Sequence, residues 1–120
     1  MVILWVALAG GVGAVIRWLV SAWFAERAPR GTGTTLVNLV GALGLGAVVA
    51  LSHNGQLHPD VAVVIGTGLL GALTTFSTWM VETLEGSEGA MAGIWWRTVP
   101  HVLMGMGLVM VGTHLGGGVN

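Results

Sequence analysis

Residues 71–79 read Gly-Ala-Leu-Thr-Thr-Phe-Ser-Thr-Trp and lie in the middle of a long apolar stretch. Four hydroxyl side chains within the five positions 74–78 are unusual for a helix that faces lipid. Such hydroxyls bond to backbone carbonyls and bend helices, and a broken helix is tolerated at membrane depth only where it is buried or lines a cavity. The segment therefore predicts a break near residues 74–78, which would free carbonyls for a cation and N–H groups for an anion. A continuous helix with self-bonded hydroxyls is the alternative.

The composition places this segment in a membrane. Of the 120 residues, 54% are hydrophobic and 8% are charged, whereas a soluble domain carries about 25% charged residues. A membrane-spanning helix needs about 20 apolar residues, and four stretches of the chain come close to that length. We expect an all-α membrane protein with a single four-helix transmembrane domain over residues 1–120, its third helix broken at mid-membrane. The expected spans are about 2–24, 34–51, 61–84 and 94–115.

In the first span, the Ala-Leu-Ala segment at residues 7–9 resembles the cleavage site of a secretory signal. A signal peptide also needs a basic start, and no Lys or Arg precedes this segment. We expect this span to be retained, which puts both termini on the same side of the membrane. Arg27, Arg30 and Arg97 flank the loops after the first and third spans, and the opposite side has no Lys or Arg. A bias this small is compatible with one preferred orientation and with insertion in both directions.

Small residues recur at helical spacing within three of the expected spans. In lipid, such residues let helix backbones approach closely, and van der Waals packing then drives association. Because four short helices enclose little interior, we also expect a homo-oligomer. The small-residue faces are Gly10, Gly13 and Ala14 in the first span; Asn38, Gly41, Ala42 and Leu45 in the second; and Gly68, Gly71 and Ala72 in the third.

Two roles are possible for each of the polar and aromatic side chains inside the spans. Arg17 lies about 10 Å of helical rise from the end of the first span. It either extends to the interface or provides a fixed cation at a pore mouth. Asn38 either satisfies a neighbouring helix or coordinates a dehydrated anion through its N–H donors. Phe76 and Trp79 share a helix face, and they either pack together or present their electropositive ring edges to an anion.

The sequence lacks residues that several classes of protein need for their function. Glu82 is near the end of the third span, and no carboxylate lies in the middle of any span. Buried carboxylates form the proton relays of many coupled transporters, so passive conduction is favoured. The net charge of −1 offers no basic patch for nucleic acid, and without Cys there are no disulfides or thiolate metal sites. No nucleophile has a neighbouring base, so an enzyme is not expected. Surface or packing roles are expected for His53, His58, His101 and His114, which lack metal-ligand spacing.

Three segments together resemble the Fluc (CrcB) family of fluoride channels. They are residues 10–18 (GGVGAVIRW), 33–41 (GTTLVNLVG) and 66–78 (GTGLLGALTTFST), and the third is the most specific. The resemblance covers nearly the whole chain. It implies a dual-topology antiparallel homodimer in the cell inner (plasma) membrane, with two fluoride pores along the subunit interface. Passive export through these pores would lower the toxic cytoplasmic fluoride concentration.

The resemblance also implies roles for single residues. The broken third helices would cross at the dimer centre and hold a structural sodium ion, which is not transported, through main-chain oxygens of Gly71 and Thr74. The implied fluoride pore is lined by Asn38, Phe76, Ser77, Thr78 and Trp79, with Arg17 and Glu82 in its vestibule.

Trp79 departs from the family pattern, which has a second pore phenylalanine at this position. The larger ring points either to altered conductance or to a subunit of a hetero-dimeric fluoride channel. A small multidrug-type proton-coupled transporter is another hypothesis, but the first span of that class carries a buried Glu, and here it carries Arg17. A non-conducting assembly subunit would need no polar track at all.

Overall fold

The computed structural model describes residues 1–86 and 91–119. Helices make up most of this part of the chain, and they follow one another along the sequence with short connections. The elements are α1 (Val2–Ala25), α2 (Thr32–His53), α3 (Pro59–Val63), the π-helix η1 (Val64–Leu70), α4 (Gly71–Leu73), α5 (Phe76–Gly86) and α6 (Met91–Leu115).

These elements form four helical stretches that are long and apolar enough to cross a membrane: Val2–Ala25, Thr32–His53, Pro59–Gly86 and Ala92–Leu115. The predicted all-α class and the four spans are confirmed, with ends that differ by a few residues from the expected ones. Most of the apolar side chains face outward, since only 6% to 28% of the most apolar window of each span is buried inside the chain. Such a surface is suited to lipid.

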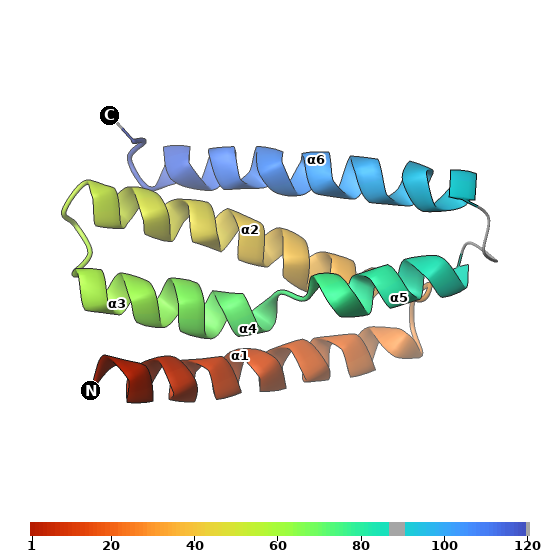
Figure 1. Ribbon diagram of the computed structural model, residues 1–120, viewed down its shortest axis with the longest axis horizontal. Helices are drawn as coiled ribbons and strands as arrows, with labels where there is room; N and C mark the ends of the chain where they lie inside the picture. Colours follow the sequence, from red (N-terminus) through yellow and green to blue (C-terminus); the bar gives the residue numbers. More distant parts are fainter. Residues whose placement is uncertain (87–90, 120) are drawn as a thin grey trace.

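The four spans lie side by side along the longest dimension of the molecule, which measures 47 Å (Figure 1). In this view α2 lies between α6 and the third span, and α1 packs along η1 and α4 on the far side of the third span. The two termini lie at the same end of the bundle, as the sequence predicts. The loop from α1 to α2, which carries Arg27 and Arg30, lies at the opposite end.

Glycines set the close contacts between helices. A Cβ atom on Gly13 of α1 would collide with the carbonyl of Leu69 in η1, and one on Gly68 would lie 2.8 Å from the carbonyl oxygen of Val6. The predicted small-residue faces of the first and third spans therefore do meet. A second crossing, between α2 and α6, depends on Gly112, where a Cβ would collide with the carbonyl of Leu43.

The third span is broken, as predicted, but over a shorter segment. It passes from α3 through the π-helix η1 into α4, and the helix stops at Thr74, whose φ of −80° and ψ of 147° are extended. The predicted break over residues 74–78 is too long, because α5 already begins at Phe76. Thr75 explains the early restart: its hydroxyl oxygen accepts the backbone N–H of Thr78 at 3.4 Å. A threonine at this position caps a helix N-terminus.

Adding one methyl group at Gly112 tests the packing of α2 against α6. We expect Gly112→Ala to lower the free energy of unfolding by about 1–3 kcal/mol, because a side chain forced into a filled space costs this much. Gly107→Ala adds the same methyl group on the same helix, where no atom lies within 4 Å, and should not lower stability. Titration with a denaturing detergent compares the two variants. Equal stability would contradict the close helix contact.

Candidate functional site

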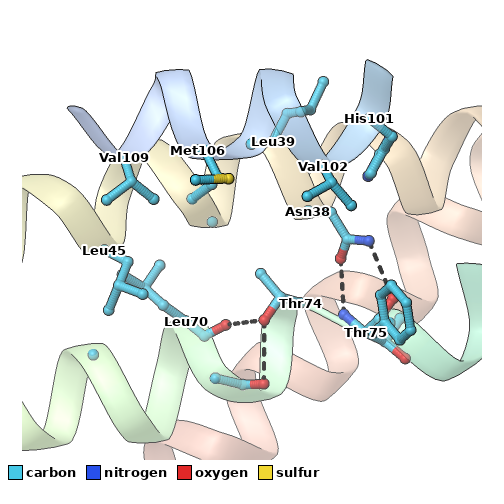
Figure 2. Close-up of a pocket in the computed structure, with 16 residues that line it drawn as sticks. Asn38, Leu39, Leu45, Leu70, Thr74, Thr75, His101, Val102, Met106 and Val109 are labelled. Carbon is cyan, nitrogen blue, oxygen red and sulfur yellow. Dashed lines mark hydrogen bonds between the residues drawn. The ribbon is translucent and has the colours of Figure 1, made fainter. Parts of the chain in front are cut away.

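Asn38 joins the break in the third span to α2. Its Oδ1 accepts the backbone N–H of Thr75 at 2.8 Å, and its Nδ2 donates to the carbonyl of Thr75 at 3.1 Å (Figure 2). One side chain thus satisfies both backbone groups of a residue that has left the helix. Gly41, one turn further along α2, leaves room for Thr74, because a Cβ at Gly41 would collide with the Thr74 methyl group. The same face of α2 therefore binds one residue of the break and accommodates the other.

This arrangement changes the partners of one carbonyl in α4. In a continuous helix the N–H of Thr75 would donate to the carbonyl of Gly71, four residues earlier, but here it donates to Asn38. The Gly71 oxygen keeps only a long contact of 3.5 Å from the Thr74 hydroxyl, which also donates to Leu70 at 3.0 Å. Within the part of the chain that the structure describes, the Gly71 carbonyl therefore lacks its ordinary helical partner.

A cavity of about 400 Å³ lies beside the break, between α2 and α6. We call it the inner cavity. Its α2 wall is the predicted face with Asn38, Gly41, Ala42 and Leu45, which confirms that these residues lie together. Figure 2 shows the break on one side of this space and α6 on the other. The polar and aromatic part of its lining consists of Asn38, Thr74, Thr75, Phe76 and His101.

A second cavity of about 310 Å³, the outer cavity, lies nearer the loop that follows α1. Its lining is more polar than that of the inner cavity and includes charged side chains. Arg30 also forms an ion pair of 3.1 Å with Glu85 at the exposed surface, so its charge is partly offset. The residues that give the outer cavity its character are Arg30, Thr35, Trp79, Glu82, Arg97 and His101.

Glu82 is held between α2 and the outer cavity. Its Oε1 accepts the hydroxyl of Thr34 at 3.1 Å. Its Oε2 is buried, and it has no hydrogen-bond partner among residues 1–86 and 91–119. Gly31, at a φ of +88°, lies against this oxygen, where a Cβ would come within 3.4 Å. A larger residue at Gly31 would therefore crowd the carboxylate as well as strain the backbone.

The structure brings some of the predicted site residues together and leaves others apart. Phe76 in the inner cavity and Trp79 in the outer cavity have ring centroids 5.8 Å apart, but Phe76 is 62% exposed and Trp79 only 5%. Ser77 and Thr78 line neither cavity. Both are exposed, and both contact the hydroxyl of Thr75, at 3.4 Å and 3.2 Å. Arg17 on α1 also lies outside the two cavities.

The Arg and His residues of the cavity linings were missed as site residues from the sequence. Arg30 and Arg97 entered only as markers of orientation, and His101 was assigned a surface or packing role. The available signal was spacing, because Arg97 and His101 are four residues apart and therefore share a face of α6. Spacing alone does not reveal that this face of α6 borders both cavities, rather than the lipid.

A broken membrane helix beside two partly polar cavities, within four helical stretches that can cross a membrane, defines a small multi-pass membrane protein. The chain matches the family model described as "CrcB-like protein, Camphor Resistance (CrcB)" over residues 4–113, and it belongs to this family. Similar proteins named "Fluoride-specific ion channel FluC" occur in Shewanella frigidimarina, at 42% identity, in Shewanella denitrificans, at 39%, and in Shewanella woodyi, at 37%. Each match covers 95% of this chain and 91% of the relative.

Removal of the Asn38 amide tests its hold on the break. Asn38→Ala leaves both backbone groups of Thr75 unpaired, at a cost of about 1–3 kcal/mol for each buried group. We therefore expect faster hydrogen exchange at residues 74–76, measured by mass spectrometry in detergent. Leu39→Ala is the matched control, since Leu39 lines the same cavity without bonding to the break. Unchanged exchange in the Asn38 variant would contradict the assignment.

Proposed function

We propose that this chain forms a passive, fluoride-specific channel in the plasma membrane, exporting fluoride and so lowering its concentration in the cytoplasm. The observation that carries the proposal is membership of a family whose similar members are named fluoride channels. The geometry around Asn38 and the broken third span supplies hydrogen-bond donors where such an ion would pass. The chain thus acts by binding and conduction, and not as an enzyme.

In this proposal Asn38 both satisfies the backbone of a neighbouring helix and coordinates the anion. Its Oδ1 and one of its two Nδ2 protons are used by Thr75. The second Nδ2 proton is then available to an anion in the inner cavity, which Asn38 lines. The ring of Phe76, at the same cavity, can present an electropositive edge. Neutral donors of this kind replace part of the water shell of an ion without holding it so strongly that conduction stops.

Coupling to protons is not part of the proposal. Glu82 is half-buried, and it lies in the outer cavity with one oxygen bound to Thr34. Among the described residues 1–86 and 91–119, the inner cavity has no carboxylate in its lining. A proton-coupled exchanger of the small multidrug type would need a buried carboxylate near the middle of the membrane. That alternative therefore has less support than passive flow down the electrochemical gradient.

A second copy of the chain, arranged antiparallel, would complete the pore. Phe76, Ser77 and Thr78 are exposed on a single chain, although hydroxyl groups in the membrane are better placed against protein than against lipid. A partner that covered this surface would enclose the hydroxyls as a polar track. The vestibule role of Arg17, which lies outside both cavities of one chain, likewise depends on that partner. A second homologous subunit in place of an identical copy would explain Trp79.

A structural sodium ion suits the break. The Gly71 carbonyl has lost its helical N–H partner to Asn38, and Thr74, half-buried and extended, directs its own carbonyl out of the helix. Unwound backbone carbonyls coordinate sodium in membrane proteins. The main-chain oxygens of Gly71 and Thr74 from two copies would hold the ion at the centre of the dimer. Bound there, sodium supplies fixed positive charge that joins the two copies.

Ion flux from liposomes is the direct test of the proposed function. We expect the purified chain to release fluoride at least about a hundredfold faster than chloride, because closely spaced donors favour the smaller halide. A fluoride-selective electrode and a chloride electrode measure the two rates. Equal rates for the two ions would overturn the claim of selectivity, and no flux from this chain alone would support the subunit of a hetero-dimeric channel.

Thr78→Val in the same assay separates conduction from assembly. If Thr78 lines the pore, this variant should assemble normally and conduct less fluoride. Thr113→Val is the control, because Thr113 is on α6, its hydroxyl donates to the carbonyl of Met110, and it lines neither cavity. Loss of assembly with no loss of flux per assembled unit would favour a structural role.

Removal of sodium tests the proposed ion at the break. When N-methylglucamine replaces sodium throughout purification, the two copies should separate more readily, because facing carbonyls then repel without a cation between them. Analytical ultracentrifugation in detergent measures the dimer fraction, and restored sodium should recover it. A dimer fraction that does not depend on sodium would contradict this part of the proposal.

A further inference from the structure

His101 belongs to the lining of both cavities. It is half-buried on α6, and its side chain borders the outer cavity together with Arg97 and the inner cavity together with Asn38. Figure 2 shows the imidazole pointing from α6 into the inner cavity. An ion that moved from one cavity to the other within this chain would therefore pass this side chain.

The two cavities follow one another along the same three helices. On each helix, one residue of the outer lining and one of the inner lining lie about one turn apart and so share a face. The same spacing of outer and inner lining residues occurs on all three helices, and His101 lines both cavities. The cavities are therefore successive parts of one groove, with His101 at their boundary. The pairs are Thr35 and Asn38 on α2, Trp79 and Phe76 on α5, and Arg97 and His101 on α6.

The ring of His101 is held by Trp79. Their centroids are 4.3 Å apart and their planes are inclined by 21°, a stacked arrangement. Stacking occupies one face of the imidazole and leaves its nitrogen atoms at the ring edge. Neither nitrogen has a hydrogen-bond partner within residues 1–86 and 91–119. Because a neutral imidazole carries one N–H donor and an imidazolium carries two, a donor is available at the boundary in either state.

No other side chain of α6 offers a donor to the inner cavity. Beyond His101, the lining from this helix consists of Val102, Gly105, Met106 and Val109. The remaining donors come from α2 and the break, where Asn38 has a single free N–H. An anion that leaves the guanidinium of Arg97 in the outer cavity therefore meets His101 one helical turn later, before it reaches Asn38.

We propose that His101, oriented by Trp79, donates a hydrogen bond to fluoride at the boundary between the outer and inner cavities. The inference rests on the proposed function, since it assigns a further ion contact to the same conduction path. Arg97 attracts the anion to the outer cavity, and Glu82 faces the same space with the opposite charge. The N–H of His101 then replaces water that the ion loses at the boundary between the two cavities. The stack with Trp79 keeps this donor in place.

Substitution of His101 tests the contact in fluoride efflux from liposomes. His101→Phe keeps a ring for stacking on Trp79 but has no N–H, so fluoride flux should fall by at least about tenfold, the effect of losing one hydrogen bond to a charged group. His101→Gln restores a neutral N–H donor and should keep flux within about threefold of the native chain. His114→Phe makes the same change on the same helix at an exposed position outside both cavities, and flux should be unaffected.

The possible results of this experiment test the proposed function and the role of His101 separately. If the native chain carries no fluoride, the proposed function fails. If the native chain and His101→Phe conduct equally, only the role of His101 fails. A larger loss of flux in His101→Gln than in His101→Phe, with dimer assembly intact, would show that ring packing matters and not the donor, and would overturn the inference.

A measurement on the native chain covers the case in which the variants do not fold. The imidazole nitrogen resonances of His101, recorded by NMR on protein labelled with nitrogen-15 in detergent, should shift on addition of sodium fluoride and stay in place with sodium chloride. The resonances of His114 provide the internal reference. Absence of a fluoride-specific shift at His101, under conditions where the native chain conducts, would overturn the proposed contact.

Discussion

The hydrogen-bonded pair between Asn38 and Thr75 is the constraint on which the rest of the molecule depends. A break in a membrane helix leaves backbone groups without partners, and lipid cannot supply them. Asn38 supplies both for Thr75, at 2.8 Å and 3.1 Å, and in doing so it removes the partner of the Gly71 carbonyl. The same side chain therefore stabilises the irregular backbone and creates the polar surface beside it. The inner cavity exists because the third span is held open at this position and Gly41 allows it to lie against α2.

Most of the fold could be predicted from the sequence because hydrophobicity and spacing determine it. The low share of charged residues predicts a membrane protein, and the run of hydroxyl residues after Gly71 predicts the break. The length of the break could not be predicted from the run of hydroxyl residues. Ser77 and Thr78 look like part of the interruption, yet the hydroxyl of Thr75 caps the next helix and lets α5 begin at Phe76. One hydrogen bond decides this boundary, and its formation depends on the backbone geometry of Thr74.

The site was less predictable than the fold because its charged residues come from different helices. Arg30 follows α1, Arg97 lies near the start of α6, and Glu82 lies on α5, so their common cavity results from how the helices pack. Glycines determine that packing: Gly112 brings α6 against α2 and turns His101 toward the cavities. His101 has an unremarkable sequence context, and its significance arises only from the face of α6 that this contact selects.

The distribution of charge along the groove agrees with a path for a small anion. The outer cavity contains positively and negatively charged side chains. Together they can attract an ion from water and release it again quickly. Among the residues that the structure describes, the inner cavity has no carboxylate and no Arg in its lining, so the groups there that can contact an anion are N–H groups, hydroxyls and aromatic ring edges, set among aliphatic side chains. A full positive charge at this depth would bind the anion tightly and slow its release, whereas neutral donors of limited strength allow it to leave. Because fluoride is the smallest halide and the strongest hydrogen-bond acceptor among them, it gains most from such donors. Neutral side-chain donors in the inner cavity are thus consistent with the passive flow proposed for this chain.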